Sequence, residues 1–256
     1  MKTVTMSPFL PPEILDLILD NLNDERTLKT CCLVSKPWFP CARRRLFFRV
    51  GFSSRSTIKS WTKAFPDPST SPGHHTRSLY LCEGAAVDIA GRGVSAWVRT
   101  FCNVVDLRMV SVRWNGNQAT LVSYHKLFPT LKSLSICNCN IPHSLLPGLI
   151  RSFPLLEDLR LNLRPAADTT AIDERIVPST SPELTGTLRL SGDFRPVLPT
   201  LLGLPNGFRF SMVVISSLVN DSDLTRDLVL ECSDTLESLS VSYVSARTFS
   251  QTSAAD

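Results

Sequence analysis

Hydrophobic residues between positions 10 and 48 recur at three- and four-residue intervals in three short segments, the spacing of amphipathic helices. The first segment begins at Pro12, which suits a first helical turn because its missing N–H would have no partner inside the helix. Its apolar residues form two rows, one of Ile14, Ile18 and Leu22 and a second of Leu15 and Leu19. A helix this short packs only one such row against its neighbours. The pattern therefore predicts an apolar surface that another protein covers.

Two further helices are expected after short breaks in this pattern. Asp24 is placed to cap the second helix. The apolar side of that helix consists of Leu28, Cys31, Cys32 and Val34. Pro37 begins the third helix, which carries Trp38, Cys41, Ala42, Leu46 and Phe47. A unit of about 40 residues normally lacks the core to fold stably without a partner.

After the three helices, the sequence predicts one more helix and then a segment that breaks helical structure. Ile58, Trp61 and Phe65 lie at helical spacing and predict one packing helix over about residues 56–65. The proline, serine and glycine residues of segment 66–73 break any helix and make this segment the best candidate for a domain boundary.

An internal repeat follows the boundary. Residues 128–136 (FPTLKSLSI) are matched 25 residues later by residues 153–161 (FPLLEDLRL), and TLKSLSI returns as TLESLSV at residues 235–241. Weaker copies of the same Leu-x-Leu step lie at Leu79/Leu81, Leu107/Met109, Leu188/Leu190 and, weakest of all, Phe210/Met212. A period in the twenties predicts stacked supersecondary units.

Each unit is expected to contain a strand and a returning helix. Alternation places Leu134 and Ile136 on the inward side of a strand, with Ser133, Ser135 and Cys137 facing outward. Apolar residues from 141 to 153 then have the three- and four-residue spacing of a helix. Stacking such units predicts an α/β fold, with a parallel sheet on one face and helices on the other.

The N-terminal segment resembles a known module. The order Leu10-Pro11, Glu13-Ile14, Ile18, Leu22, Leu28, Leu33-Val34-Ser35, Trp38 and Leu46-Phe47 is similar to that of an F-box. The resemblance implies a three-helix domain that docks onto a Skp-type adaptor and so joins a cullin-based ubiquitin ligase. Carried over by position, the residues that make or support this contact are Leu10, Pro11, Ile14, Ile18, Leu22, Val34 and Trp38. For each of them taken singly, a plain core role is an open alternative.

The repeats resemble a second family. Leu131-x-x-Leu134-x-Ile136-x-x-Cys139-x-Ile141 is similar to the cysteine-containing leucine-rich repeat, and residues 156–161 fit its first half, with Arg164 where Cys or Asn belongs. An F-box followed by irregular leucine-rich repeats is a familiar combination in large fungal families. The fold expected from both resemblances is an F-box at residues 7–50, a connecting helix and Pro/Ser-rich linker at 51–75, and a short leucine-rich-repeat-like solenoid at 76–256. An ordinary mixed α/β domain with coincidental spacing is the alternative.

The outward residues of the strands are the candidate surface for a target protein. In leucine-rich-repeat folds these positions line the concave face. Three of them are arginines that come from nearly successive copies, Arg108, Arg160 and Arg189. Arginine grips carboxylates and phosphates with two parallel hydrogen bonds, so we expect an acidic or phosphorylated segment as ligand.

Composition and charge argue against a membrane protein and against nucleic acid as the partner. Hydrophobic residues make up 43% and charged residues 20% of the chain, as in a folded protein. No run approaches the roughly 18 apolar residues of a membrane span, and the N-terminus is a poor secretion signal, so a cytoplasmic or nuclear location is expected. The net charge of +4 is concentrated around Arg43, Arg44, Arg45 and Arg49. Nucleic acid is not the favoured partner, because binding it needs a broader basic surface with interleaved aromatics.

The eight cysteines do not form a recognisable site. Cys31 and Cys32 are adjacent and Cys137-x-Cys139 stands alone, so no four-ligand zinc pattern is present in the sequence. A catalytic cysteine paired with His125 or His143 has no local signature, and a hydrolase that uses Cys139 or Cys232 has no recognisable partner set. We therefore expect a non-enzymatic adaptor without cofactor or metal that presents an unknown target protein to a cullin-based ligase. A protein-interaction scaffold outside any ligase is the alternative.

Overall fold

The computed structural model describes residues 10–22, 24–82, 97–112, 127–139, 141, 145–163, 184–192, 194, 198–203, 209–217 and 222–243. Three helices come first, α1 (Pro12–Asp20), α2 (Glu25–Val34) and α3 (Trp38–Leu46). The helical elements that follow are α4 (Arg55–Ala64), the 3-10 turns η1 (Pro68–Thr70), η2 (Pro72–His75) and η4 (Val98–Phe101), and helices α6 (Leu146–Arg151), α7 (Leu198–Leu202) and α8 (Ser222–Glu231). The strands are β1 (Arg49–Phe52), β2 (Ser78–Leu81), β3 (Asp106–Val110), β4 (Ser133–Cys139), β5 (Asp158–Leu163), β6 (Thr187–Gly192), β7 (Met212–Ser217) and β8 (Ser238–Tyr243).

The first three helices have a small core of their own, as the sequence predicted. Leu19 from α1, Leu28 and Cys31 from α2 and Ala42 from α3 are buried together. The Asp24 carboxylate accepts a hydrogen bond from the Thr27 backbone N–H at 2.8 Å, so the predicted N-cap of the second helix is confirmed. A cluster this small leaves most of the helical surface outside it.

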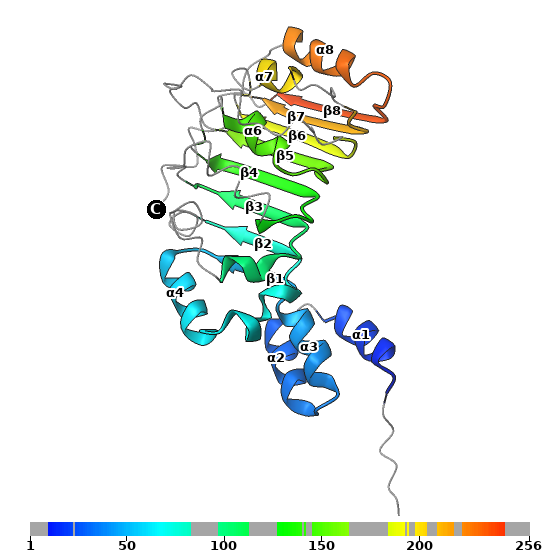
Figure 1. The fold of residues 1–256 in the computed structure, drawn as a ribbon. Coiled ribbons are helices and arrows are strands. Elements are labelled where there is room, and N and C mark those ends of the chain that lie inside the picture. The colour runs from blue at the N-terminus through cyan, green and yellow to red at the C-terminus, as the bar shows by residue number, and fades with distance from the viewer. Residues whose placement is uncertain are drawn as a thin grey trace, which may run out of the picture.

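The eight strands within the described residues are all parallel, and neighbours in the sheet are neighbours in the chain, β1 to β8. Figure 1 shows them rising one after another from β1, beside the three helices, to β8 at the opposite end of the molecule. The predicted parallel sheet is therefore confirmed. Equivalent residues of adjacent strands are 25 to 29 positions apart in sequence, and 24 after the bulge in β4. This spacing leaves room in each step for a strand and a return to the start of the next.

Alternation along the strands decides which face is buried. Leu79 and Leu81 of β2 are fully buried, as are Leu107 and Met109, Leu134 and Ile136, and Leu188 and Leu190 of the strands that follow. These side chains belong to one continuous hydrophobic core that runs along the sheet. The predicted returning helix is confirmed as α6, whose Leu146, Leu149 and Ile150 pack into the same core.

An aromatic cluster closes the core at the β1 end. The ring of Phe52 lies edge-on to Trp61 of α4 at 5.6 Å and to Phe101 at 5.9 Å between centroids. Phe47 contacts Trp61 in the same way at 5.8 Å. The predicted helix at 56–65 is thus confirmed as α4, and its role is to cover the first strand.

Two sequence predictions need correction. The sheet begins one strand before the predicted repeat region, at β1, which spans the expected boundary between residues 7–50 and 51–75; Val50 and Phe52 are the inward pair of this strand, which pairs with β2. The weak copy predicted at Phe210/Met212 lies three residues before the inward pair of the strand. Val213 and Ile215 are the inward pair of β7, whereas Phe210 is buried just before the strand and Met212 is exposed.

Segment 66–73 breaks the helix as predicted, yet it is not a loose spacer. Pro68–Thr70 and Pro72–His75 form two 3-10 turns, and Ser71, Pro72 and Gly73 are buried. A Cβ on Gly73 would lie 2.2 Å from the Thr100 hydroxyl, so the chain packs here without room for a side chain. The segment fastens the helical unit to the sheet.

The inward and outward positions of one strand predict opposite effects on stability. Replacing Leu159 with Ala should lower the free energy of unfolding by about 2–5 kcal/mol, because Leu159 is fully buried. Replacing its exposed neighbour Arg160 with Ala should change it by less than about 0.5 kcal/mol. Urea unfolding followed by circular dichroism measures both, and equal effects would mean that the register of β5 is wrong.

Candidate functional site

Helix α1 has an apolar face that the described part of the chain does not cover. Leu15 and Leu19 point into the protein and are buried. Ile14, Leu17 and Ile18 lie three and four residues apart on the opposite side and are 41%, 61% and 39% exposed. A nine-residue helix has thus placed one of its two apolar rows in solvent, as the sequence predicted.

The predicted adaptor-binding residues divide into two groups. Leu10, Pro11, Ile14, Ile18 and Val34 are exposed. Leu22 and Trp38 are half-buried and pack against the small helical core, where they can support the exposed row without forming its surface.

Three exposed hydrophobic side chains were missed as candidates. Leu17 lies three residues after Ile14, and this spacing could have identified it. Leu33, at 86% exposure, and Phe39 lie at the end of α2 and the start of α3. Only the structure separates such positions from core residues, because short helices with many apolar residues have no clear polar side.

The arginines at the end of α3 are engaged within the chain. Arg44 pairs with Asp16 of α1, and this hydrogen bond raises the pKa of the Arg44 guanidinium. Arg45 Nη1 lies 3.3 Å from the Asp20 carboxylate. Arg43 Nη2 donates to the Thr70 carbonyl at 2.9 Å. These contacts hold α1 on α3 and α3 on the 66–73 segment, so the basic cluster positions the exposed face.

A second candidate surface is the outward face of the sheet. Its strands are in register, which places Gly51, Tyr80, Arg108, Ser135, Arg160, Arg189, Val214 and Ser240 in one row across all eight strands. Arg160 and Arg189 are direct neighbours on adjacent strands, and Arg108 is separated from Arg160 by Ser135. All three arginines are exposed. The structure therefore brings the three predicted target-binding residues into one line.

The acidic residues of this face are already occupied. Asp106 accepts a hydrogen bond from the Ser78 hydroxyl at 2.8 Å, and Asp158 accepts one from the Thr187 backbone N–H at 2.6 Å. No ion pair joins Arg108, Arg160 or Arg189 to a carboxylate within the described residues. Like charges on adjacent strands repel each other, so Arg160 and Arg189 favour an anion between them.

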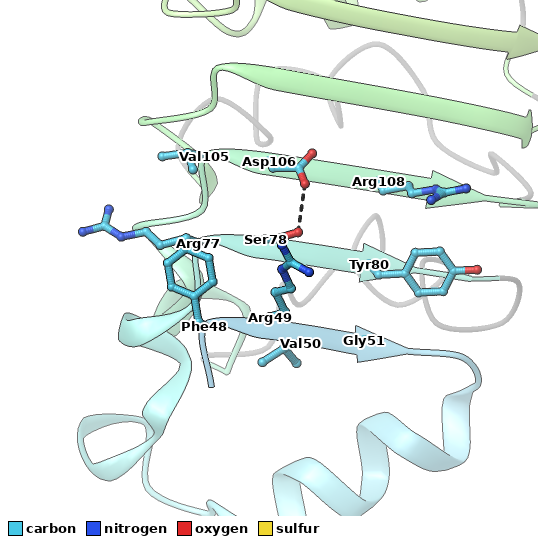
Figure 2. A pocket seen from close by; sticks show the side chains of 10 residues that line it. All are labelled: Phe48, Arg49, Val50, Gly51, Arg77, Ser78, Tyr80, Val105, Asp106 and Arg108. Atoms are coloured by element: carbon cyan, nitrogen blue, oxygen red, sulfur yellow. Dashed lines mark hydrogen bonds between the residues drawn. The ribbon is translucent and has the colours of Figure 1, made fainter. Parts of the chain in front are cut away.

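The outward face is hollowed over β1–β3 by a cavity of about 490 Å³. Its floor consists of two rows of three residues, Arg49, Ser78 and Asp106 followed by Gly51, Tyr80 and Arg108. Figure 2 shows Tyr80 and Arg108 near the carboxyl ends of their strands, with the Ser78–Asp106 hydrogen bond between the strands on the other row. The Arg108 guanidinium lies 5.8 Å from the centre of the Tyr80 ring. Partial burial raises the pKa of the Tyr80 phenol above its ordinary value.

The cysteines proposed for a hydrolase lie in the core. Cys139 follows a bulge at Asn138, which has a left-handed backbone with φ 53°, and its sulfur accepts a hydrogen bond from the Val112 N–H at 3.4 Å. Burial raises the pKa of the Cys139 thiol to about 11 and also raises the pKa of Cys232. Both are thiols at neutral pH, and a thiol is a poor nucleophile. His125, His143 and Arg164 lie outside the described residues.

Metal and membrane searches of the described residues were negative. No three His, Cys, Asp or Glu side chains within them lie together as metal ligands would. No described helix has the length and apolar character needed to cross a membrane.

Comparison with known proteins identifies one module. Residues 8–53 match the F-box-like domain family, a range that includes α1, α2, α3 and β1. The match supports an F-box protein, and domains of this kind bind Skp-type adaptors in general and are typically not catalytic. A search of curated proteins found no match to this chain.

The burial of the cysteines predicts their reactivity. Iodoacetamide at pH 8 should modify Cys102, which is exposed, and leave Cys139 and Cys232 unmodified while the protein is folded. Peptide mapping by mass spectrometry, with a urea-unfolded sample as control, measures this difference. Modification of Cys139 at the rate of Cys102 would show that its site is open.

Proposed function

We propose that this protein is a substrate-recognition adaptor subunit of a Skp–cullin–F-box ubiquitin ligase. The observation that carries the proposal is the apolar row of α1 that no described residue covers, on the segment that matches the F-box-like family. A helix that keeps Ile14, Leu17 and Ile18 in solvent is stabilised when a partner buries them. We infer that a Skp-type adaptor is this partner and that it connects the chain to a cullin.

The sheet supports the second half of the proposal. Copies of 25 to 29 residues, each contributing one parallel strand with an inward pair, are what irregular leucine-rich repeats would form. We propose that residues 76–256 are such a repeat region, that residues 7–50 are the F-box and that residues 51–75 connect them. On this proposal the combination is that of the fungal-type F-box families. The proposed target is an acidic or phosphorylated protein segment that contacts Arg108, Arg160 and Arg189 on the outward face.

The chemistry of ubiquitin transfer would then take place elsewhere in the assembly, in the cytoplasm or nucleus. A scaffold outside any ligase would use the same two surfaces. Cullin-dependent turnover of a bound protein distinguishes the two roles, because only the ligase adaptor leads to degradation.

Truncating the exposed row should weaken adaptor binding. The pair Ile14→Ala and Ile18→Ala removes apolar surface that the adaptor would bury and should raise the Kd at least about tenfold, while helix content is unchanged. Replacing Leu10 and Pro11 with Ala should also weaken binding, because both are exposed at the entry to α1. Isothermal titration of the purified chain with a Skp-type adaptor measures these effects.

The control is Leu155→Ala, which removes a leucine that is 51% exposed in the sheet region and should leave the Kd unchanged. Wild-type affinity in the Ile14/Ile18 variant would contradict the proposed docking face. A loss of affinity in the Leu155 variant would show that the effect is not local.

The arginine row predicts a specific anion effect. Phosphate should raise the Tm of the wild-type chain more than chloride at equal ionic strength, because it relieves the repulsion between Arg160 and Arg189. In a variant with both arginines changed to Ala this difference should disappear. Differential scanning fluorimetry measures this difference in Tm. The same phosphate effect in the variant would show that phosphate does not bind at Arg160 and Arg189.

A further inference from the structure

The cavity over β1–β3 lies at the β1 end of the arginine row, with which it shares Arg108, and a glycine forms part of its floor. Gly51 occupies the outward position of β1 next to Tyr80, and a Cβ built there would lie 3.6 Å from Tyr80 Cδ1. Since Gly51 has no side chain, the Tyr80 ring is open on its β1 side. The backbone of Gly51 is not left-handed, so this position does not require glycine for conformational reasons. The absence of a side chain instead leaves the space open.

Charge at the rim of the cavity is predominantly positive. Arg49, Arg77 and Arg108 line it against one carboxylate, Asp106, which already accepts the Ser78 hydrogen bond. Arg77 Nη1 donates to the Asn103 carbonyl at 3.2 Å. Arg49 and Arg108 form no ion pair with any carboxylate in the described part of the chain. Among the described residues, the cavity thus combines two guanidinium groups that form no ion pair with an aromatic ring, which Arg108 contacts.

We propose that this cavity binds one anionic side chain, an aspartate, glutamate or phosphorylated serine or threonine, of an extended target segment. Arg49 and Arg108 hold the anion with charge-assisted hydrogen bonds, and the Tyr80 ring packs against the aliphatic part of the same side chain. The segment continues across the strands, where Arg160 and Arg189 lie in the same row as Arg108. The proposal rests on the target-binding role of the sheet, and it is independent of adaptor docking.

A peptide fits this surface better than a single-stranded nucleic acid. A single-stranded nucleic acid carries a phosphate at every nucleotide and is held mainly by positive charge along its whole path. Residues 61–256 carry one more acidic than basic residue, so the sheet region lacks the general positive field that nucleic-acid binding requires.

Fluorescence anisotropy with the full chain, bound to a Skp-type adaptor, tests the proposal. The probes are labelled octapeptides of alternating glycine with glutamate, phosphoserine or glutamine, and a labelled single-stranded oligothymidine. We expect the glutamate or the phosphoserine peptide to bind at least about tenfold more tightly than the glutamine peptide, with affinity falling as salt rises. The anionic peptide with the lower Kd identifies the kind of acidic residue that the cavity binds.

Two variants distinguish the contribution of the arginine charges from that of the open space in the cavity. Changing Arg49 and Arg108 together to Ala removes the charge, whereas Gly51→Leu fills the cavity and leaves all arginines in place. Each variant should raise the Kd for the anionic peptide at least about tenfold. The matched control is Arg226→Ala, an exposed arginine on α8 that is paired with Asp223 and Asp227, and it should have no effect.

Adaptor binding by every variant shows that the helical unit is intact and keeps the two proposals separate. Absence of anionic-peptide binding by the wild-type chain, or unchanged binding in Gly51→Leu, would overturn the cavity proposal even where the adaptor binds. Binding of oligothymidine that Gly51→Leu abolishes would also overturn it, in favour of a nucleic-acid site.

Discussion

The structure depends on one constraint: each strand can bury its inward pair of side chains only by stacking on the next copy. A strand such as β4 presents Leu134 and Ile136 to the core and has no means of covering them alone. Parallel pairing in strict chain order covers these residues along the whole sheet. The same alternation leaves the other face polar and continuous, because every copy places its outward residues in the same register.

The inward side chains are covered at the β1 end of the sheet but remain partly exposed at the β8 end. At β1, α4 and the rings of Phe52, Trp61 and Phe101 close the core. At β8, Leu239 and Val241 are inward positions that are 46% and 36% exposed, since no described strand follows. The three helices join the closed end through β1, through Arg43 and through the Thr76 hydroxyl, which donates to the Phe47 carbonyl. The two candidate surfaces therefore belong to one connected body.

Sequence periodicity predicted α1 to α4, α6, most strands and the inward face, because each depends on local spacing, but it did not identify α7 or α8. It missed β1, whose four residues contain a glycine and only two apolar side chains. It also misplaced β7, since Phe210 precedes its strand by the same interval at which Leu131 precedes Leu134 and was mistaken for a strand residue. The cavity at Gly51 and the pairing of Arg44 with Asp16 depend on residues 28 or 29 positions apart meeting in space. No local pattern contains that information.

The central claim is that the helical unit and the sheet carry separate surfaces for separate partners. Hydrogen–deuterium exchange of the full chain with and without a Skp-type adaptor tests it most directly. The account predicts slower exchange in peptides covering residues 10–20 when the adaptor is bound, and unchanged exchange in strands β2–β6. No complex, or protection spread across the outward strands with α1 unchanged, would contradict it.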